Sequence, residues 1–332
     1  MLYILSIASV LSQCNDVTFL GPGKLDVRQV EKMFPLALER LNLKPTVPRP
    51  RLPMVSECAR AVLNTRFGTV IVQSSYVPAV RRFGGAFLVC EFPFQKEVSW
   101  RNRLRLKTYR VVANSQFTAG WIQRRWGKEA QVLYPPVFAI KPLAKEPWIL
   151  GVGRFVNSKR SKRQVEMIGM FRELVAAGLN GWSLHLAGSV GHGDYARVVT
   201  EAAKGLPVSL HFNISRAELE ALYGKASIFW HATGVGVDAE ANPELMEHFG
   251  ITTAEAMSAG CVPVVINGGG QPEIVTPRCG LLWNTLEDCA AETLELTRDP
   301  DRMKRLSASA VKSSERFSFP AFARRTEEIF VS

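Results

Sequence analysis

The sequence predicts an α/β protein with two domains, each built on a parallel sheet that helices cover. The chain has 332 residues, which is enough for two domains with hydrophobic cores of their own. Short β-branched or aromatic runs alternate with segments of helical spacing along most of the chain. A segment with two prolines, Lys141–Pro147, divides this alternation into two series and is expected to link the domains.

The first series occupies residues 1–146. We expect its strands at residues 17–20, 69–73, 87–89, 110–113 and 132–134. Helical spacing is found in residues 26–41 and 118–126. Residues 43–53 contain four prolines and are expected to form an extended loop.

The beginning of this series departs from the usual order of such a domain. A doubly wound domain opens with a buried strand, a glycine-rich turn and then a helix. Here residues 1–13 have the character of that helix, and residues 17–20 have the character of the second strand. We therefore expect a first domain without its opening strand, either because the natural N-terminus is missing or because the protein diverged.

The second series occupies residues 147–314. Its expected strands are residues 148–152, 183–187, 208–212, 227–230 and 262–266. Its expected helices are residues 164–177, 216–223, 252–259 and 286–298. Alternating strands and helices are typical of parallel sheets, so the two series predict two Rossmann-like domains that face each other across a cleft.

Composition excludes several classes of protein. Apolar residues make up 47% of the chain and charged residues 21%, which excludes disordered, collagen-like and coiled-coil chains. The opening apolar run, Met1–Leu11, is too short for a membrane span and has no cationic leader. The six cysteines include no CxxC pair, so we expect buried thiols in a reducing compartment rather than disulfides or a zinc site. We therefore expect a cytoplasmic protein.

Positive charge is concentrated in the first domain. Residues 1–147 contain 22 lysines and arginines but 9 acidic residues, whereas the remainder contains 19 basic and 21 acidic residues. Two segments, 100–110 and 121–126, interleave these cations with aromatic residues. Such a surface suits an anionic membrane, a phosphorylated acceptor or a nucleic acid, and it is equally compatible with a merely solvated face. The absence of an RRM or KH signature argues against nucleic acid.

One cluster in the second domain has the residue types of a nucleotide site. Glu247 precedes a small-residue helix, and Glu255 lies about one turn into that helix. Helix N-termini attract phosphate through their unpaired amides and their dipole. Glu255 is placed to accept two ribose hydroxyls, and Glu247 is expected to face the cleft. The alternative is a capping arrangement with one exposed acid.

Two further clusters follow predicted strands of the same domain. After residues 148–152 come Gly153, Arg154 and, five residues later, Lys159. Two cations there can neutralise a diphosphate, and no pair of aspartates suited to a metal accompanies them. After residues 262–266 come three glycines, including Gly269 and Gly270, which permit close backbone approach to a ligand. In isolation, each cluster is also compatible with a plain solvated loop.

Taken together, the clusters resemble the retaining family 4 glycosyltransferases of GT-B fold. The resemblance rests on Glu247 and Glu255 with Phe249-Gly250 between them, on Gly153-Arg154 with Lys159, and on the loop 268–275. Residues 112–118 and 134–137 also resemble that family, and residues 315–332 resemble its final helix, which usually crosses back to the first domain. Within the family, His231-Ala232-Thr233 followed by 247–250 is most similar to α-mannosyltransferases that extend lipid-linked glycans.

The resemblance implies roles for these residues. Arg154 and Lys159 would hold the donor diphosphate next to Gly153, and Glu255 would bind the ribose. The backbone of Phe249, Gly250, Ile251 and Thr252 would lie near phosphate and sugar. Glu247 would position the transferred sugar without acting as nucleophile or general base. The remaining candidates for the sugar or the cleft are His231, Gly269, Gly270 and Glu91.

Glu91 marks a departure from the family pattern. Members often carry a histidine after the strand that corresponds to residues 87–89, but this chain has no histidine before His185 and has Glu91 there. Glu91 therefore either takes over a sugar contact, accompanies a different donor sugar or accompanies impaired activity. It is equally compatible with a surface acid beside a proline turn.

These observations predict an enzyme of the hexosyltransferase class. We expect it to transfer mannose or glucose from a GDP- or UDP-hexose to a glycan or glycolipid hydroxyl, with retention of the α configuration, no cofactor and no metal. The alternative is a catalytically weak nucleotide-sugar-binding subunit that supports a partner transferase. Nucleic acid is not an expected partner. An anionic membrane surface is a further expected partner, which would place the protein peripherally on the inner face of a membrane.

Overall fold

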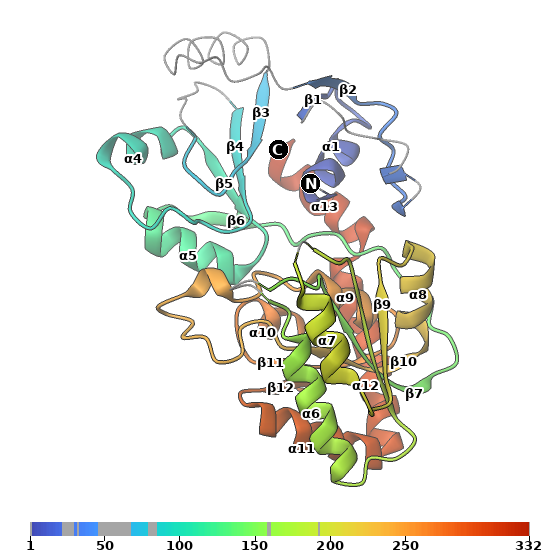
Figure 1. The fold of residues 1–332 in the computed structure, drawn as a ribbon. Helices are drawn as coiled ribbons and strands as arrows, with labels where there is room; N and C mark the ends of the chain where they lie inside the picture. The colour runs from blue at the N-terminus through green and yellow to red at the C-terminus, as the bar shows by residue number, and fades with distance from the viewer. Residues whose placement is uncertain are drawn as a thin grey trace. The chain divides into compact units, whose positions relative to one another are not determined.

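The chain folds into two compact units, residues 1–138 with 319–332, and residues 139–318 (Figure 1). The computed structural model describes residues 2–21, 30–31, 33–45, 68–78, 85–157, 161–191 and 193–331. Each unit combines parallel strands with helices, so the predicted α/β architecture of two Rossmann-like domains is confirmed.

The described strands of the first unit form two separate parallel sheets. One contains β1 and β2, and the other contains β3, β4, β5 and β6 in that order. Their bounds are β1 Thr18–Gly21, β2 Asn42–Pro45, β3 Thr69–Gln73, β4 Gly85–Cys90, β5 Arg110–Ala113 and β6 Ala130–Val132. The strands predicted at 69–73 and 110–113 have these bounds in the structure.

Four helices are described in full in this unit. They are α1 Leu2–Leu11, α4 Trp100–Leu106, α5 Gln116–Trp126 and α13 Phe319–Phe330. Ser115 caps the start of α5, since its hydroxyl accepts a hydrogen bond from the amide of Thr118, and Gly127 follows the helix in the left-handed conformation. The last helix packs on α1, and both contribute to one core with Phe87 of β4.

Two sequence expectations for this unit are wrong. In the stretch predicted as a helix at 26–41, the described helical residues end at Met33, and residues 34–41 are not helical. Pro35 explains this end, because a proline disfavours helical geometry at the residue before it. The predicted loop 43–53 begins within β2, while its residues beyond Pro45 lie outside the described ranges.

The second unit contains a parallel sheet of six described strands. Their order across the sheet is β12-β11-β10-β7-β8-β9. Their bounds are β7 Glu146–Val152, β8 Ser183–Gly188, β9 Val208–Phe212, β10 Ala226–His231, β11 Val262–Ile266 and β12 Leu281–Trp283. The strand order reverses between β7 and β10, and in open α/β sheets ligands bind beyond the carboxyl ends of the strands at such a point.

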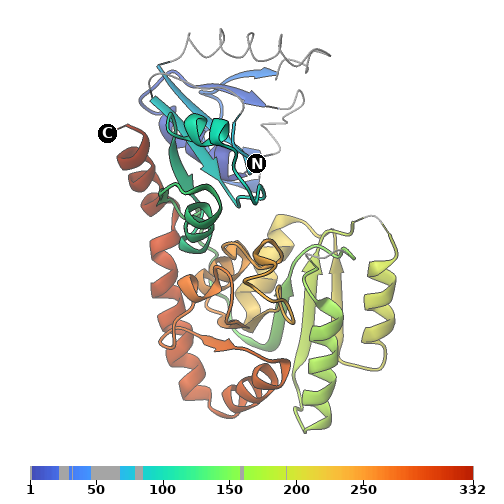
Figure 2. The same ribbon diagram turned by 90° about the vertical axis from the view of Figure 1, so that its left-hand side faces the viewer.

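Helices cover both faces of this sheet (Figures 1 and 2). Helix α6 packs on α7 and on α11, and α9 packs on α8 and on α12. The bounds are α6 Gln164–Ala176, α7 Tyr195–Ala203, α8 Arg216–Lys225, α9 Ile251–Ser258, α10 Gln271–Ile274, α11 Leu286–Arg298 and α12 Pro300–Ser314, with 3-10 turns at Pro243–Leu245 and Glu315–Phe317. Capping boxes start α8 at Ser215 and α11 at Thr285. Sequence analysis missed β12, α7, α12 and the short α10, which lies within the loop expected at 268–275.

Candidate functional site

The candidate site of the second unit lies where the sheet order reverses. The ends of β7 and β10 are hydrogen-bonded neighbours, with Gly151 paired to Trp230. Gly153 and Arg154 follow β7, and His231 is the last residue of β10. The loop with Gly269 follows β11, which pairs with the other edge of β10. The topology thus brings three of the predicted clusters to one end of the sheet.

Gly153 is required by the path of a lysine side chain. A Cβ atom at Gly153 would lie 2.4 Å from Cγ of Lys162. The carbonyl groups of Gly153 and Arg154 each accept a hydrogen bond, at 3.2 Å, from Nε2 of Gln164 in the first turn of α6. Arg154 itself is exposed. The strand end is therefore fixed by α6 and leaves room for Lys162 to cross it.

Lys162 and His231 converge on one carboxylate oxygen of Glu247. Nζ of Lys162 lies 2.5 Å from Oε2 of Glu247, and Nε2 of His231 lies 3.0 Å from the same oxygen. Oγ1 of Thr233 lies 3.4 Å from that histidine nitrogen. Among the described residues, no hydrogen bond is found for Nδ1 of His231, which is buried.

The electrostatics of this group favour an ionised Glu247 and a neutral His231. Burial raises the pKa of Glu247, but the charge of Lys162 and the hydrogen bond from His231 outweigh it and hold that pKa well below its usual value. Burial lowers the pKa of His231, and its hydrogen bond to Glu247 offsets this only in part. At neutral pH the histidine is therefore a neutral donor to a carboxylate that Lys162 neutralises.

The glycine-rich loop packs directly on the backbone around Glu247. The amide of Gly270 donates a hydrogen bond to the carbonyl oxygen of Glu247 at 2.8 Å. A Cβ atom at Gly269, whose φ is +61°, would lie 2.1 Å from that oxygen. One at Gly270 would lie 2.5 Å from the carbonyl oxygen of His248. The structure therefore shows these glycines in close contact with the chain itself, a role that the sequence did not predict.

The start of α9 carries the other predicted binding residues. Gly250, with φ +111°, precedes Ile251 and Thr252 in the first turn, and no side chain caps this end of the helix. Phe249 turns its ring into the fold against Phe317, so only its backbone is placed toward the helix start. The unbonded amides of a helix N-terminus are donors for an anion.

Glu255 is held by two partners from α8. Nη1 of Arg216 lies 2.6 Å from its Oε1, and the hydroxyl of Tyr223 donates to its Oε2 at 3.2 Å. Arg216 also pairs with Glu220 at 2.8 Å. Glu255 is 7% exposed. Because each carboxylate oxygen offers two acceptor positions, these contacts leave capacity for ribose hydroxyls.

Of the two remaining predicted site residues, the structure describes Glu91 alone. Lys159 lies outside the described residues. Glu91 follows β4 in the first unit, is half-buried, and accepts a hydrogen bond at its backbone carbonyl from the hydroxyl of Thr118. Within the described ranges, no group of three or more His, Cys, Asp and Glu side chains is arranged to share a metal ion.

Residues 137–313, more than half of the chain, match the family described as "Glycosyl transferases group 1". The chain belongs to this family. Among the described helices, none combines the length and the apolar character needed to cross a bilayer.

Two curated relatives of this chain come from Dictyostelium discoideum. One is named GDP-Man:Man(3)GlcNAc(2)-PP-Dol alpha-1,2-mannosyltransferase and is 25% identical over 240 residues, 65% of this chain and 45% of the relative. The other, alpha-1,3/1,6-mannosyltransferase ALG2, is 35% identical over 86 residues, 25% of this chain and 20% of that protein. The chain thus spans less than half the length of either.

Solved structures of similar fold cover nearly the whole chain. A glycosyltransferase from Rickettsia africae matches 98% of this chain and 92% of its own with a TM-score of 0.75 at 16% identity. HepE from Anabaena, solved with UDP and glucose, matches 99% of this chain and 95% of its own with a TM-score of 0.66 at 15% identity. These likenesses confirm the expected GT-B fold.

Sequence analysis missed three residues of the site. Lys162 was not singled out, because it stands in a run of lysines and arginines, and the sequence does not show which of these side chains reaches Glu247. Arg216 and Tyr223 of α8 belong to no motif that the sequence analysis identified. Their spacing of seven positions, which predicts that they share one face of a helix, could have indicated them.

Proposed function

We propose that this protein transfers a hexose, mannose or glucose, from a nucleotide sugar to an acceptor hydroxyl with retention of the α configuration. The observation that carries the proposal is the convergence of Lys162 and His231 on Glu247 beside the open start of α9. It combines a cation, a fixed carboxylate and a helix N-terminus at the crevice where α/β sheets bind ligands.

The charges fit the departure of a nucleoside diphosphate. Negative charge grows on the diphosphate as the glycosidic bond breaks, and Lys162, Arg154 and the amides at the start of α9 are the groups that stabilise it. The same cations neutralise the diphosphate without a metal ion. We therefore also propose that the transfer needs no metal ion.

Glu247 positions the sugar in this proposal. Its Oε2 is bound by Lys162 and His231, whereas no hydrogen bond from the described residues reaches Oε1. Oε1 is thus the oxygen that accepts a sugar hydroxyl. Retention then follows from attack on the same face as the departing diphosphate, which takes the acceptor proton, so Glu247 remains ionised throughout.

Both GDP- and UDP-hexoses are candidate donors. The curated relative that matches 65% of the chain is named for a GDP-mannose reaction, and the HepE structure contains UDP and glucose. Glu255 binds the ribose, and Arg216 and Tyr223 hold the orientation of the Glu255 side chain. Because Glu255 contacts ribose and not the base, its geometry favours neither nucleotide.

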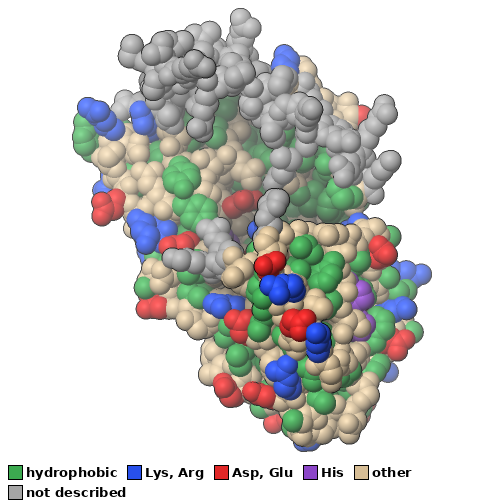
Figure 3. Space-filling view, viewed as in Figure 1, with side chains coloured by type: hydrophobic (Ala, Val, Ile, Leu, Met, Phe, Trp, Pro, Cys, Tyr) green, Lys and Arg blue, Asp and Glu red, His purple; other side chains and the backbone are tan. Residues whose placement is uncertain are grey.

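We also propose that the acceptor is a glycan or glycolipid presented at an anionic membrane surface. Helix α4 exposes 67% of Trp100 and 37% of Leu104 among its arginines, and Arg101 lies over the Trp100 ring. Basic side chains gather over α4 and α5 on the face shown in Figure 3. Exposed tryptophan beside cations is typical of peripheral contact with anionic headgroups. Equal sedimentation with neutral and anionic vesicles would refute this contact.

The experiment for the transfer reaction is calorimetric titration with GDP, UDP, ADP and their hexose conjugates in EDTA. We expect one nucleotide to bind, and its hexose conjugate to be consumed when glycolipid acceptors are supplied. Binding without turnover on any acceptor would favour the supporting-subunit alternative. No binding at all would overturn the proposal.

A further inference from the structure

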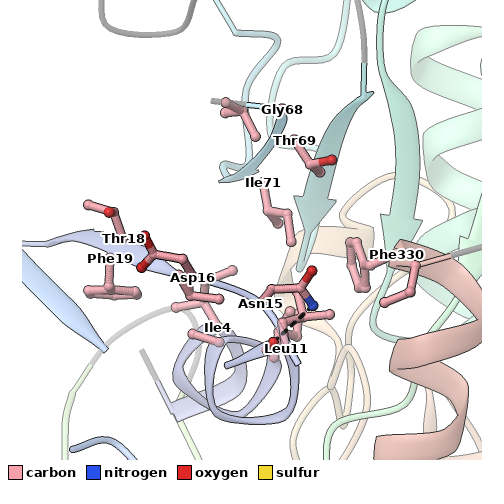
Figure 4. A pocket seen from close by; sticks show the side chains of 15 residues that line it. Ile4, Leu11, Asn15, Asp16, Thr18, Phe19, Gly68, Thr69, Ile71 and Phe330 are labelled. Atoms are coloured by element: carbon pink, nitrogen blue, oxygen red, sulfur yellow. Dashed lines mark hydrogen bonds between the residues drawn. The ribbon is translucent and has the colours of Figure 1, made fainter. Parts of the chain in front are cut away.

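The cavity in the first unit offers little for the recognition of a polar ligand. It has a volume of about 530 Å³ and is lined by residues of α1, β1, β3 and α13, most of them apolar (Figure 4). Among the described residues, the buried side-chain polar atoms without a hydrogen bond all lie in the second unit. The second unit also contains a lysine, Lys145, whose ammonium group has no role in the candidate site described above.

Lys145 joins the ends of two helices of the second unit. Its Nζ donates hydrogen bonds to the carbonyl oxygens of Ala226, 2.8 Å away, and of Ala259, 2.7 Å away. These two residues are the C-caps of α8 and α9. The carbonyl oxygen of Tyr223, in the last turn of α8, lies 3.4 Å from the same nitrogen. One ammonium group thus faces carbonyls at both helix ends, where helices leave such groups unpaired and where their dipoles favour a cation.

The segment that carries Lys145 is bound to the same two helix ends. The amide of Ile140 donates a hydrogen bond to Oγ of Ser258, the last residue of α9, at 3.2 Å. The amide of Leu143 donates to the carbonyl oxygen of Gly224 in α8 at 3.1 Å. Gly224 leaves room for this segment, because a Cβ atom there would lie 2.9 Å from Cγ of Leu143. A fixed stretch of backbone therefore presents Lys145 to both helices.

The two helices that Lys145 joins also build the proposed ribose contact. Glu255 belongs to α9, whereas Arg216 and Tyr223, which hold its two carboxylate oxygens, belong to α8. Tyr223 contacts Glu255 through its hydroxyl and Lys145 through its carbonyl group. A shift of α8 along α9 would therefore break contacts at both places. The spacing of the two helices thus controls the orientation of the Glu255 carboxylate.

We propose that Lys145 is a positioning residue for the ribose of the nucleotide donor. By fixing α8 against α9, its ammonium group keeps the Glu255 carboxylate in the orientation that accepts ribose hydroxyls. This role rests on the proposed function, in which Glu255 binds the ribose. Lys145 lies at the end of α9 and not at its open start, so it is not placed to touch the diphosphate. Its effect should therefore be confined to the ribose part of the ligand.

The ribose contact is measured by the affinity ratio between a ribonucleoside diphosphate and its 2′-deoxy form. Calorimetry gives both dissociation constants, with GDP or UDP according to which one the parent protein binds. We expect the parent protein to favour the ribonucleotide about tenfold, the effect of one hydrogen bond to a charged group. Lys145→Met keeps the length of the side chain but removes its donors, and should lower this preference to about twofold.

Inorganic pyrophosphate separates a positioning role from a general loss of structure. It has no ribose, so its affinity should differ between Lys145→Met and the parent protein by less than about twofold. Lys141→Met is the matched control, because it removes the same charge from an exposed residue of the same segment. This control should keep the ribose preference of the parent protein. Lys145→Arg keeps a charge and several donors, and should recover most of that preference.

The results distinguish a failure of this role from a failure of the proposed function. A parent protein that binds no nucleoside diphosphate overturns the proposed function, and the role of Lys145 with it. A parent protein that prefers ribose, together with a Lys145→Met variant that keeps the preference, refutes the role of Lys145 alone. Equal losses of nucleotide and pyrophosphate affinity in Lys145→Met also refute it, because the effect is then not confined to the ribose.

Hydrogen exchange on the parent protein provides the test if Lys145→Met does not fold. Coupling between two places is reciprocal, so ribose bound at Glu255 should hold the ends of α8 and α9 together. We expect the nucleoside diphosphate to slow exchange about threefold at the amides of residues 222–226, at the end of α8, and pyrophosphate to leave them unchanged. Equal slowing by the two ligands, or none by either, refutes the proposal.

Discussion

Nζ of Lys162 lies 2.5 Å from Oε2 of Glu247, across 85 positions of the sequence. The contact depends on the absence of a side chain at Gly153, over which Lys162 passes. It pairs the cation that we assign to the donor diphosphate with the carboxylate that we assign to the sugar. A bound diphosphate therefore competes with Glu247 for this lysine.

The variant Lys162→Ala should weaken nucleoside diphosphate binding by about ten- to a hundredfold. Charge-assisted hydrogen bonds of this kind contribute roughly 1.5–3 kcal/mol. Lys159→Ala is the companion variant, because the sequence assigns this second cation to the same diphosphate. Calorimetry on both proteins compares the two lysines. An unchanged Kd in Lys162→Ala would contradict its assignment, and a larger loss in Lys159→Ala would make Lys159 the main cation of the diphosphate site.

Substitution of Glu247 should separate turnover from nucleotide affinity. Glu247→Gln keeps the shape but removes the charge that Lys162 and His231 hold in place. We expect kcat to fall by about a hundredfold or more, as for the loss of an interaction made in the transition state. The Kd for the nucleoside diphosphate should not rise, because Lys162 loses the carboxylate that competes with the diphosphate for it. A protein with full turnover and weakened nucleotide binding would reverse the roles of Glu247 and Glu255.

Much of the fold could be predicted from the sequence. Residues 262–266 form an apolar run and residues 208–212 alternate apolar and polar side chains, and both strands have the bounds predicted. The helix predicted at 26–41 is wrong past Met33, because helical spacing was given more weight than Pro35. The short β12 at 281–283 has too few residues for a periodic signal.

The candidate site was predictable as a set of positions but not as a set of contacts. Gly153 and Gly269 follow predicted parallel strands, and the structure places both at the carboxyl end of the sheet. Which lysine of the basic run reaches Glu247 depends on the path of the loop after β7, and no sequence pattern describes that path. Likewise, the sequence does not distinguish a glycine that allows close approach of a ligand from a glycine that allows close approach of the protein's own backbone.

A methyl group at Gly269 should disrupt the site through the backbone. Gly269→Ala places Cβ against the carbonyl of Glu247 and adds strain at positive φ, so we expect a loss of stability of about 2 kcal/mol. Gly169→Ala is the control, because Gly169 lies in α6 with nothing within 4 Å of its added Cβ. That change should stabilise the unit by up to about 1 kcal/mol. Urea unfolding measures both, and equal effects would contradict the contact.

Removing one partner of the buried ion pair between Arg216 and Glu255 should destabilise the protein more than replacing both partners. Arg216→Met leaves a buried carboxylate without its cation and should cost about 3–5 kcal/mol. Tyr223→Phe removes one hydrogen bond and should cost about 1 kcal/mol. Adding Glu255→Gln to Arg216→Met should recover much of the loss, because the unpaired charge is gone. A double variant that is less stable than Arg216→Met alone would rule out this account.

The stacked pair of His185 and His211 should make stability depend on pH. The rings lie parallel, with Nδ1 of His185 3.0 Å from Nε2 of His211, and Ser183 and Trp148 contact the other side of His185. Burial, followed by the charge of His211, lowers the pKa of His185 to about 4. The pKa of His211 is also lowered by burial, although Glu218 nearby raises it.

The neutral form of His185 is thus favoured in the folded protein, whereas the unfolded chain takes up its proton near pH 6.5. The contribution of His185 to the free energy of unfolding is therefore fully present above pH 6.5 and is lost as the pH falls toward 4. The loss over that window amounts to about 3 kcal/mol. His185→Phe keeps the stacked ring but cannot titrate. Urea unfolding between pH 7.5 and about 4.5 should show a shallower loss for this variant than for the parent protein. Parallel pH profiles for the two proteins would show that His185 binds its proton equally in both states.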